Sequence, residues 1–227
     1  MTDIRAVIFD YGMVLSAPAD PVSYRMLLDV FGAPPEVFEK HYWAHRHAYD
    51  RGVLDGREYW QRLANDAGIS LTDVQLVELV RNDVKMWSML DTSMVEWALQ
   101  VAQSGMTTGI LSNICPELTS AFEKECAWLD KIHHKFWSSR LGMAKPSPTI
   151  YLHMLDKLAL PAEQVLFLDD REENIQAARE LGISAIQYAD ADALATELKN
   201  LNLSQHLPPL PVLHALPRRF LDYTPSL

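Results

Sequence analysis

Short apolar runs, each followed by a polar side chain, recur along the chain. Ala6–Phe9 is apolar without a break, and Asp10 follows it at once. A later run of the same kind, Val165–Leu168, leads into Asp169, and the shorter pair Ile110-Leu111 leads into Ser112. Uninterrupted apolar runs of about four to eight residues are typical of strands that are buried on both faces of a parallel sheet. The pattern therefore predicts a parallel sheet whose strands end at polar residues.

The spacing of apolar residues changes to that of helices directly after the first strand. Gly32 and the pair Pro34-Pro35 separate the first two helices of this region, and Gly68 ends the third. Four helices are predicted here without an intervening strand: Val22–Phe31, Glu36–Asp50, Glu58–Ala67 and Thr72–Trp87. We therefore expect residues 16–90 to form an all-helical cap that is inserted after the first strand.

Strands and helices alternate after residue 90. The predicted strands are 108–112, 134–138, 164–168 and 183–187, and the predicted helices are 93–103, 116–126, 148–158, 175–181 and 191–199. Such alternation builds a parallel sheet with helices on both faces. We predict an α/β fold in which residues 1–15 and 91–204 form a doubly wound parallel sheet.

The last segment, residues 205–227, has a different composition. It contains five prolines, so it cannot be one long helix. It also contains many large apolar residues, which argues against a disordered tail. We expect this segment to lie extended against the core or against a neighbouring subunit, where it could serve a partner or a homodimer.

Composition limits the functions that remain. The 227 residues include 30 acidic and 20 basic side chains, a net charge of −10, which argues against binding of nucleic acid or of anionic membranes. Two cysteines, Cys115 and Cys126, are too few for a disulfide framework. Neither a signal-peptide pattern nor an apolar run of about 20 residues is visible. We expect a cytoplasmic protein that acts on a small molecule.

Four groups of polar residues lie at predicted strand ends or in loops between elements. They are Asp10, Ser112-Asn113, Lys145 and Asp169-Asp170. Taken singly, each has a structural explanation, such as a helix cap, a solvated loop cation or the acidic start of a helix. Taken together they favour a site, because a doubly wound sheet brings the carboxyl ends of its strands to one crevice.

The chemistry of these groups points to phosphoryl transfer. Three carboxylates repel one another unless a cation neutralises them, and hard oxygen ligands suit Mg²⁺. A carboxylate that is free to attack can form an acyl phosphate. A hydroxyl, an amide and a lysine supply donors for phosphoryl oxygens.

Four segments carry a resemblance to a known family. Phe9–Gly12, Leu111–Asn113, Leu141–Pro146 and Phe167–Asp170 resemble, in this order, the motifs of the haloacid dehalogenase (HAD) superfamily. The resemblance covers roughly residues 4–190 and implies a Rossmann-like core. The helical insertion resembles the cap of the family's first subgroup.

By this resemblance, Asp10 is the nucleophile. Ser112 and the backbone of Asn113 would hold the phosphoryl group, and Lys145 would neutralise both the nucleophile and the transferred group. The substrate would be a small phosphorylated molecule.

The resemblance also implies a Mg²⁺ cofactor. Asp10, the backbone carbonyl of Gly12 and Asp170 would be ligands of the metal. Asp169 would bind it directly or through water.

Gly12 departs from the pattern of the family. Phosphatases of the family usually carry a second Asp at this position, which protonates the leaving group. General acid catalysis is worth about 10²–10⁴-fold, so its loss weighs against a phosphomutase and matters most for poor leaving groups. The chain resembles α-glucose-1-phosphatase-like phosphatases, which also carry glycine here, and their substrates have an anomeric leaving group. A sugar phosphate is therefore one candidate substrate.

Two other functions remain open at this point. A metal-independent 2-haloacid dehalogenase would use Asp10 to attack carbon, but it would gain nothing from the adjacent acids Asp169-Asp170. A weakly active or non-catalytic binding module is the second alternative, because Gly12 breaks a common rule. On the cap, a histidine among His41, His45 and His47 could contact the substrate or supply the missing acid. Five tryptophans are expected to be packing residues: Trp60, Trp87, Trp97, Trp128 and Trp137.

Overall fold

A five-stranded parallel sheet forms the centre of the computed structural model, which describes residues 3–211 and 217–220. Its strands, in spatial order, are β4 (His134–Trp137), β3 (Thr107–Ser112), β1 (Ala6–Phe9), β5 (Val165–Asp169) and β6 (Ser184–Gln187). Phe9 pairs with Ile110 on one side and with Leu168 on the other. Asp10, Ser112 and Asp169 therefore leave the sheet at nearly the same level.

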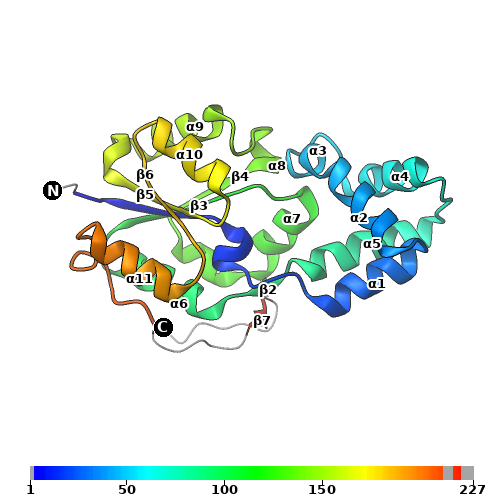
Figure 1. The fold of residues 1–227 in the computed structure, drawn as a ribbon, viewed down its shortest axis with the longest axis horizontal. Coiled ribbons are helices and arrows are strands. Elements are labelled where there is room, and N and C mark those ends of the chain that lie inside the picture. The colour runs from blue at the N-terminus through cyan, green and yellow to red at the C-terminus, as the bar shows by residue number, and fades with distance from the viewer. Residues whose placement is uncertain (1–2, 212–216, 221–227) are drawn as a thin grey trace.

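Helices cover both faces of the sheet (Figure 1). Along β1, Val7 and Phe9 belong to one apolar cluster, whereas Ala6 and Ile8 belong to another. The helices that follow the insertion are α6 (Thr92–Gln103), α7 (Pro116–Glu125), α8 (Ser138–Leu141), α9 (Pro148–Leu158), α10 (Glu172–Glu180) and α11 (Ala191–Asn200). The side chains of α9 and α10 pack in one cluster, and those of α6, α7 and α11 pack in the other. This arrangement confirms the predicted α/β fold.

The insertion forms a helical lobe beside the sheet (Figure 1). Its helices are α1 (Pro21–Phe31), α2 (Pro35–Ala44), α3 (Arg46–Asp50), α4 (Gly56–Ala67) and α5 (Asp73–Met86). Capping boxes define two of the helix starts, Asp55 with Glu58 and Thr72 with Gln75. No described helix of the protein is long and apolar enough to cross a bilayer.

The prediction of one helix over Glu36–Asp50 was wrong. The chain leaves helical geometry at His45 (φ −111°, ψ 0°) and starts again as α3. Two side-chain pairings accompany the break: His45 Nε2 lies 2.6 Å from Asp66, and Arg46 turns toward buried Asp83. The ring of His45 is therefore engaged by Asp66, another side chain of the same lobe.

The two segments that join the lobe to the sheet run side by side. Ser16 pairs with Leu90, which belongs to the short strand β2 (Met89–Leu90). Near the end of the chain, β7 (Arg218–Arg219) pairs with β2, and the ring of Phe220 packs 4.7 Å from that of Phe122. The described part of the last segment thus lies against the rest of the chain, whereas residues 212–216 and 221–227 of that prediction lie outside the described residues.

Candidate active site

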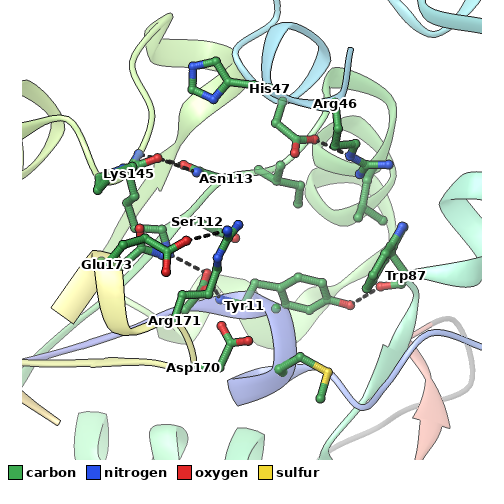
Figure 2. Close-up of a pocket in the computed structure, with 18 of the residues that line it drawn as sticks. Tyr11, Arg46, His47, Trp87, Ser112, Asn113, Lys145, Asp170, Arg171 and Glu173 are labelled. Atoms are coloured by element: carbon green, nitrogen blue, oxygen red, sulfur yellow. Dashed lines mark hydrogen bonds and ion pairs between the residues drawn. The ribbon is translucent and has the colours of Figure 1, made fainter. Parts of the chain in front are cut away.

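The structure brings the predicted site residues to one cavity of about 620 Å³ between the sheet and the helical lobe. The cavity is lined by Asp10, Gly12, Ser112, Asn113, Lys145 and Asp170. Asp169 lies behind this wall and has no exposed surface. Figure 2 shows Lys145 and Asn113 joined side by side, with Ser112 next to them and Asp170 lower in the view.

A tight turn after β1 sets the position of Asp10. The backbone N–H of Tyr11 donates to Asp10 Oδ1 over 2.7 Å, and the Asp10 N–H donates to Leu168 O on the neighbouring strand. Met13 adopts a left-handed conformation (φ 57°), which costs energy for a residue with a side chain. Gly12 does not need this freedom, since its φ is −58° and an added Cβ would come no closer than 3.9 Å to Asp10.

Lys145 is buried between two carboxylates. Its Nζ lies 2.9 Å from Asp10 Oδ1 and 2.5 Å from Asp169 Oδ2. The side chain of Asn113 holds the Lys145 backbone by donating to its carbonyl oxygen (2.8 Å) and accepting from its N–H (2.9 Å). The amide of Asn113 is therefore occupied with Lys145, which leaves its backbone as the part that the sequence assigned to the phosphoryl group.

Asp169 is the most constrained carboxylate of the site. Besides the contact with Lys145, it accepts hydrogen bonds from Asn174 Nδ2 (2.9 and 3.1 Å) and from the Arg171 N–H (2.9 Å). Tyr151 in turn donates to the carbonyl oxygen of Asn174. Asn174 was not among the predicted site residues; its place four residues after Asp170, on the first turn of α10, is the signal that could have found it.

Burial dominates the electrostatics of the cluster. It raises the pKa of Asp10, Lys145 opposes this effect, and Asp169 adds to it. Burial and the neighbouring Asp169 also raise the pKa of Asp170. For Lys145, burial acts to lower the pKa, but Asp10 and Asp169 outweigh it and raise the pKa, so the ammonium stays charged.

This donor set fits a divalent cation. Oxygens of Asp10, Asp169 and Asp170 lie within 4.8 Å of one another. Three ionised carboxylates beside one ammonium leave two negative charges uncompensated in a largely buried place, which is costly without a further cation. An all-oxygen set suits Mg²⁺.

Apart from His47, one of the three histidines that could contact the substrate, the opposite side of the cavity consists of residues that sequence reasoning did not place in the site. Arg46, His47 and Asp50 of α3 line it, together with Trp43 and Trp87. In Figure 2, His47 and Arg46 come from the helical lobe and face Asp170 and Tyr11 across the cavity. Trp87, expected to be a packing residue, is thus a wall of the cavity. The sequence shows Arg46 and Asp50 four residues apart, a spacing that pairs side chains on a helix. It does not show the helix break at His45, which turns this pair toward the cavity.

The lobe is docked onto the sheet beside this cavity. Ser138 Oγ donates to the carbonyl oxygen of Asp50, and the Arg51 guanidinium donates to Gly142 O over 3.0 and 3.2 Å. The N–H of Gly56 donates to Glu117 Oε1 over 2.6 Å. The end of α3 is therefore fixed to the loops that carry the phosphoryl-binding candidates.

Several proteins of known description are similar to this chain in sequence. Bifunctional epoxide hydrolase 2 of Sus scrofa is 27% identical over 92% of this chain, which spans only 41% of that protein. A sesquiterpene phosphatase of Aspergillus oryzae is 25% identical over 88% of this chain and 97% of its own length. D-Ribitol-5-phosphate phosphatase of Bacteroides thetaiotaomicron is 24% identical over 81% of this chain and 91% of its own length.

Solved structures share the fold. A HAD family enzyme of Bacteroides thetaiotaomicron in complex with magnesium and inorganic phosphate superimposes with a TM-score of 0.66, at 19% identity, over 84% of this chain and 98% of that one. L-2-Haloacid dehalogenase of Xanthobacter autotrophicus gives a TM-score of 0.58 at 18% identity, over 88% and 84% of the two chains.

The family itself is settled by the sequence match. A family model of haloacid dehalogenase-like hydrolases matches residues 4–182, which include all four site segments. The order of these segments, the parallel sheet that aligns them and the helical insertion agree with that match. The chain belongs to the haloacid dehalogenase-like hydrolase family.

Proposed function

We propose that the protein is a Mg²⁺-dependent phosphatase that hydrolyses a small phosphorylated metabolite through an aspartyl-phosphate. One observation carries the proposal: Asp10 stands at the floor of the cavity, beside Lys145, with two further carboxylates in reach of a shared cation. Mg²⁺, when bound by Asp10, Asp169, Asp170 and the Gly12 carbonyl, would neutralise these groups and polarise the phosphoryl oxygens. The helical lobe acts as a cap that closes the cavity against water.

The reaction that we propose has two steps on Asp10. In the first, an Asp10 carboxylate oxygen attacks phosphorus, the bond to the leaving oxygen breaks, and the leaving group departs as an alkoxide with that electron pair. In the second, water attacks phosphorus, the bond to Asp10 breaks, and inorganic phosphate leaves. The Lys145 ammonium, the Ser112 hydroxyl and the Asn113 N–H stabilise the charge on the phosphoryl oxygens.

Both the cavity and the relatives bear on the substrate. The cavity pairs this charged floor with aromatic side chains, Trp43 and Trp87, on the side of the cap. Aromatic rings can contact the apolar face of a sugar or a hydrocarbon chain. The related phosphatases are named for a polyol phosphate and for a sesquiterpene substrate. We therefore propose a phosphate ester whose organic part is a sugar or polyol, and prenyl phosphates are the second class to assay.

A phosphate-release assay tests the proposal. The wild-type protein is assayed with p-nitrophenyl phosphate, sugar and polyol phosphates and prenyl phosphates in the presence of Mg²⁺, then with EDTA, and then as Asp10→Asn. We expect turnover that both EDTA and the substitution abolish. No turnover of any ester would overturn the proposal and would favour a non-catalytic binding module.

An isotope experiment separates the phosphatase from a dehalogenase. During a single turnover in H₂¹⁸O, a phosphatase places ¹⁸O in inorganic phosphate, because water attacks phosphorus. A dehalogenase forms a carbon ester with Asp10, and water attacks the carboxyl carbon of that ester, so ¹⁸O enters Asp10 itself. We expect labelled phosphate and an unlabelled Asp10 peptide. Metal-free halide release from a 2-haloacid with a labelled Asp10 would identify a dehalogenase instead.

A further inference from the structure

The cavity contains no acid at the position where phosphatases of this kind carry one. Gly12 has no side chain, although its backbone (φ −58°, ψ 125°) would accept any residue and an added Cβ would meet no atom within 3.9 Å. An alkoxide leaving from phosphorus needs a proton, so a phosphatase at this site needs a donor from elsewhere. The inference that follows rests on the proposed function.

In-line geometry limits where the donor can stand. The attacking and leaving oxygens lie on opposite sides of the transferred phosphorus. Asp10 attacks from the sheet, so the leaving oxygen faces the cap, where α3 supplies Arg46, His47 and Asp50 to the cavity wall (Figure 2). A guanidinium does not give up its proton in proteins. His47 and Asp50 remain.

Asp50 and Asp83 share the single positive charge of Arg46, but they differ in their other hydrogen bonds. Arg46 is the one guanidinium between two carboxylates: its Nε lies 2.9 Å from Asp50 Oδ1, and its Nη1 lies 3.1 Å from Asp83 Oδ1. Asp83 also accepts a 2.6 Å hydrogen bond from the Tyr42 hydroxyl, whereas Arg46 is the only described partner of the Asp50 carboxylate. Two buried carboxylates beside one guanidinium favour the uptake of one proton. Asp50, which has fewer hydrogen bonds than Asp83, is therefore the carboxylate that takes it.

The surroundings of Asp50 agree with this assignment. Its side chain is only 15% exposed. Burial raises the pKa of Asp50, Arg46 and His47 act against this rise, and Asp83 adds to it. A carboxyl in such surroundings holds its proton at a higher pH than an ordinary aspartic acid, as a general acid must.

Asp50 is also fixed in place, whereas His47 is not. Ser138 Oγ donates to the Asp50 carbonyl oxygen and accepts from the Ile114 N–H over 2.8 Å. Ile114 directly follows Asn113, so a single hydroxyl joins the end of α3 to the phosphoryl-binding loop. His47 is exposed, and none of the described hydrogen bonds involves its ring. A proton donor has to be held within hydrogen-bond reach of its target, which favours Asp50.

We propose that Asp50 is the general acid of this enzyme and replaces the side chain that Gly12 lacks. As Asp10 attacks phosphorus and the bond to the leaving oxygen breaks, that oxygen takes the proton of the Asp50 carboxyl, and the alcohol leaves beside an Asp50 carboxylate. In the second step, Asp50 takes a proton from the water that attacks the aspartyl-phosphate, and inorganic phosphate and the original Asp10 carboxylate are released. The cap thus supplies a catalytic group to the core.

Leaving-group dependence tests this role. kcat/KM, which reports the transfer of the phosphoryl group to Asp10 and not the later hydrolysis of the aspartyl-phosphate, is measured for wild type and Asp50→Asn with p-nitrophenyl phosphate, whose leaving group needs no proton, and with the best alkyl or sugar phosphate of the panel. We expect Asp50→Asn to lose about 10²-fold or more on the alkyl ester and to stay close to wild type on p-nitrophenyl phosphate. The control Asp66→Asn removes another carboxylate of the same lobe, paired with His45 outside the cavity, and leaves both rates unchanged.

A second variant keeps the test decisive if Asp50→Asn disturbs the cap. Gly12→Asp restores an acid on the core, so it should recover the alkyl-ester rate in the Asp50→Asn background and change the wild-type rate far less. Equal losses on both esters, no loss on either, failure of the rescue, or the same selective loss in His47→Gln would overturn the role of Asp50. A wild-type protein that hydrolyses neither ester would instead overturn the proposed function, and this inference with it.

Discussion

At the scale of single residues, Asp10 is held in a place that suits reaction better than stability. Its carboxylate is buried beside Asp169, and the attraction of Lys145 does not cancel the cost of burial. Functional groups are commonly held in such unfavourable surroundings, because the strain is relieved when the ligand binds. The same reasoning applies to Asp170, whose pKa is also raised by burial.

Asp10→Asn should therefore separate activity from stability. We expect phosphate release to fall by about 10⁴-fold or more, because the substitution removes the proposed nucleophile. Without metal at pH 8, we expect the variant to melt above wild type, by roughly 2–4 °C for each kcal/mol of repulsion removed. Thermal unfolding of both proteins in EDTA checks this, and an Asn variant that melts below wild type would contradict the electrostatic argument.

Asn113 should act on the reaction through Lys145. Its side chain makes two hydrogen bonds to the Lys145 backbone, at 2.8 and 2.9 Å. We expect Asn113→Ala to lower kcat about 10- to 100-fold, because a catalytic group that is displaced by about 1 Å loses that much. Steady-state kinetics measure this change. Asn113→Asp can still accept from the Lys145 N–H but cannot donate to the Lys145 carbonyl oxygen, so its kcat should lie between those of wild type and Asn113→Ala. A wild-type kcat in Asn113→Ala would refute the role of Asn113 in positioning Lys145.

Site residues at strand ends could be predicted from the sequence, whereas those of the cap could not. Asp10, Ser112 and Asp169 follow apolar runs, and the topology of a parallel sheet brings such ends together. Asp50 ends α3 and Trp87 directly follows α5, so whether each side chain faces the cavity depends on how its helix is docked. For Asp50 that docking depends on the Ser138 and Arg51 contacts, which involve residues far apart in the chain.

At the scale of elements, the apolar patterns predicted the long helices and the buried strands but not the short pieces. The break at His45 has no glycine or proline to mark it, because it depends on tertiary pairing with Asp66. The strands β2 and β7 have two residues each, too few for any periodicity, and they exist because the end of the chain meets the two crossover segments.

Arg219 should stabilise this junction. Its guanidinium lies 2.5 Å from Asp20 Oδ2 and donates to Lys85 O over 2.9 Å, at the ends of both crossover segments. We expect Arg219→Ala to lower the free energy of unfolding by about 1–2 kcal/mol at pH 7, and the adjacent exposed control Arg218→Ala to change it little. Urea unfolding measures both, and equal effects would contradict a specific contact.

The effect of Arg219 should also depend on pH. Burial acts to raise the pKa of Asp20, but hydrogen bonds from Ser23 and Arg219 outweigh it and lower that pKa. A carboxyl whose pKa is lower in the folded state stabilises the protein above its unfolded pKa of about 3.9, and this stabilisation is lost as the pH falls through the folded value. The difference between wild type and Arg219→Ala should therefore shrink below about pH 4, and a difference that is constant down to pH 2 would contradict the ion pair.

At the scale of the whole molecule, the cavity lies between the sheet and the helical lobe, and its floor carries more carboxylates than ammonium groups. A cation that binds only the folded state stabilises it by mass action, about 2.7 kcal/mol at a concentration of 100 times Kd. We expect Mg²⁺ to raise the melting temperature of wild type, EDTA to reverse this rise, and Asp170→Asn to weaken it strongly. An equal Mg²⁺ response in Asp170→Asn would mean that the ion binds elsewhere.

The covalent state of Asp10 during turnover is the most direct test of the account. The wild-type enzyme is mixed with Mg²⁺ and its best substrate, quenched in acid within one turnover, and digested for mass spectrometry of the peptide that contains Asp10. We predict a phosphoryl group on Asp10 that appears before phosphate release and is absent in EDTA. An enzyme that releases phosphate at full rate while Asp10 stays unmodified, or after Asp10→Asn, would contradict the account.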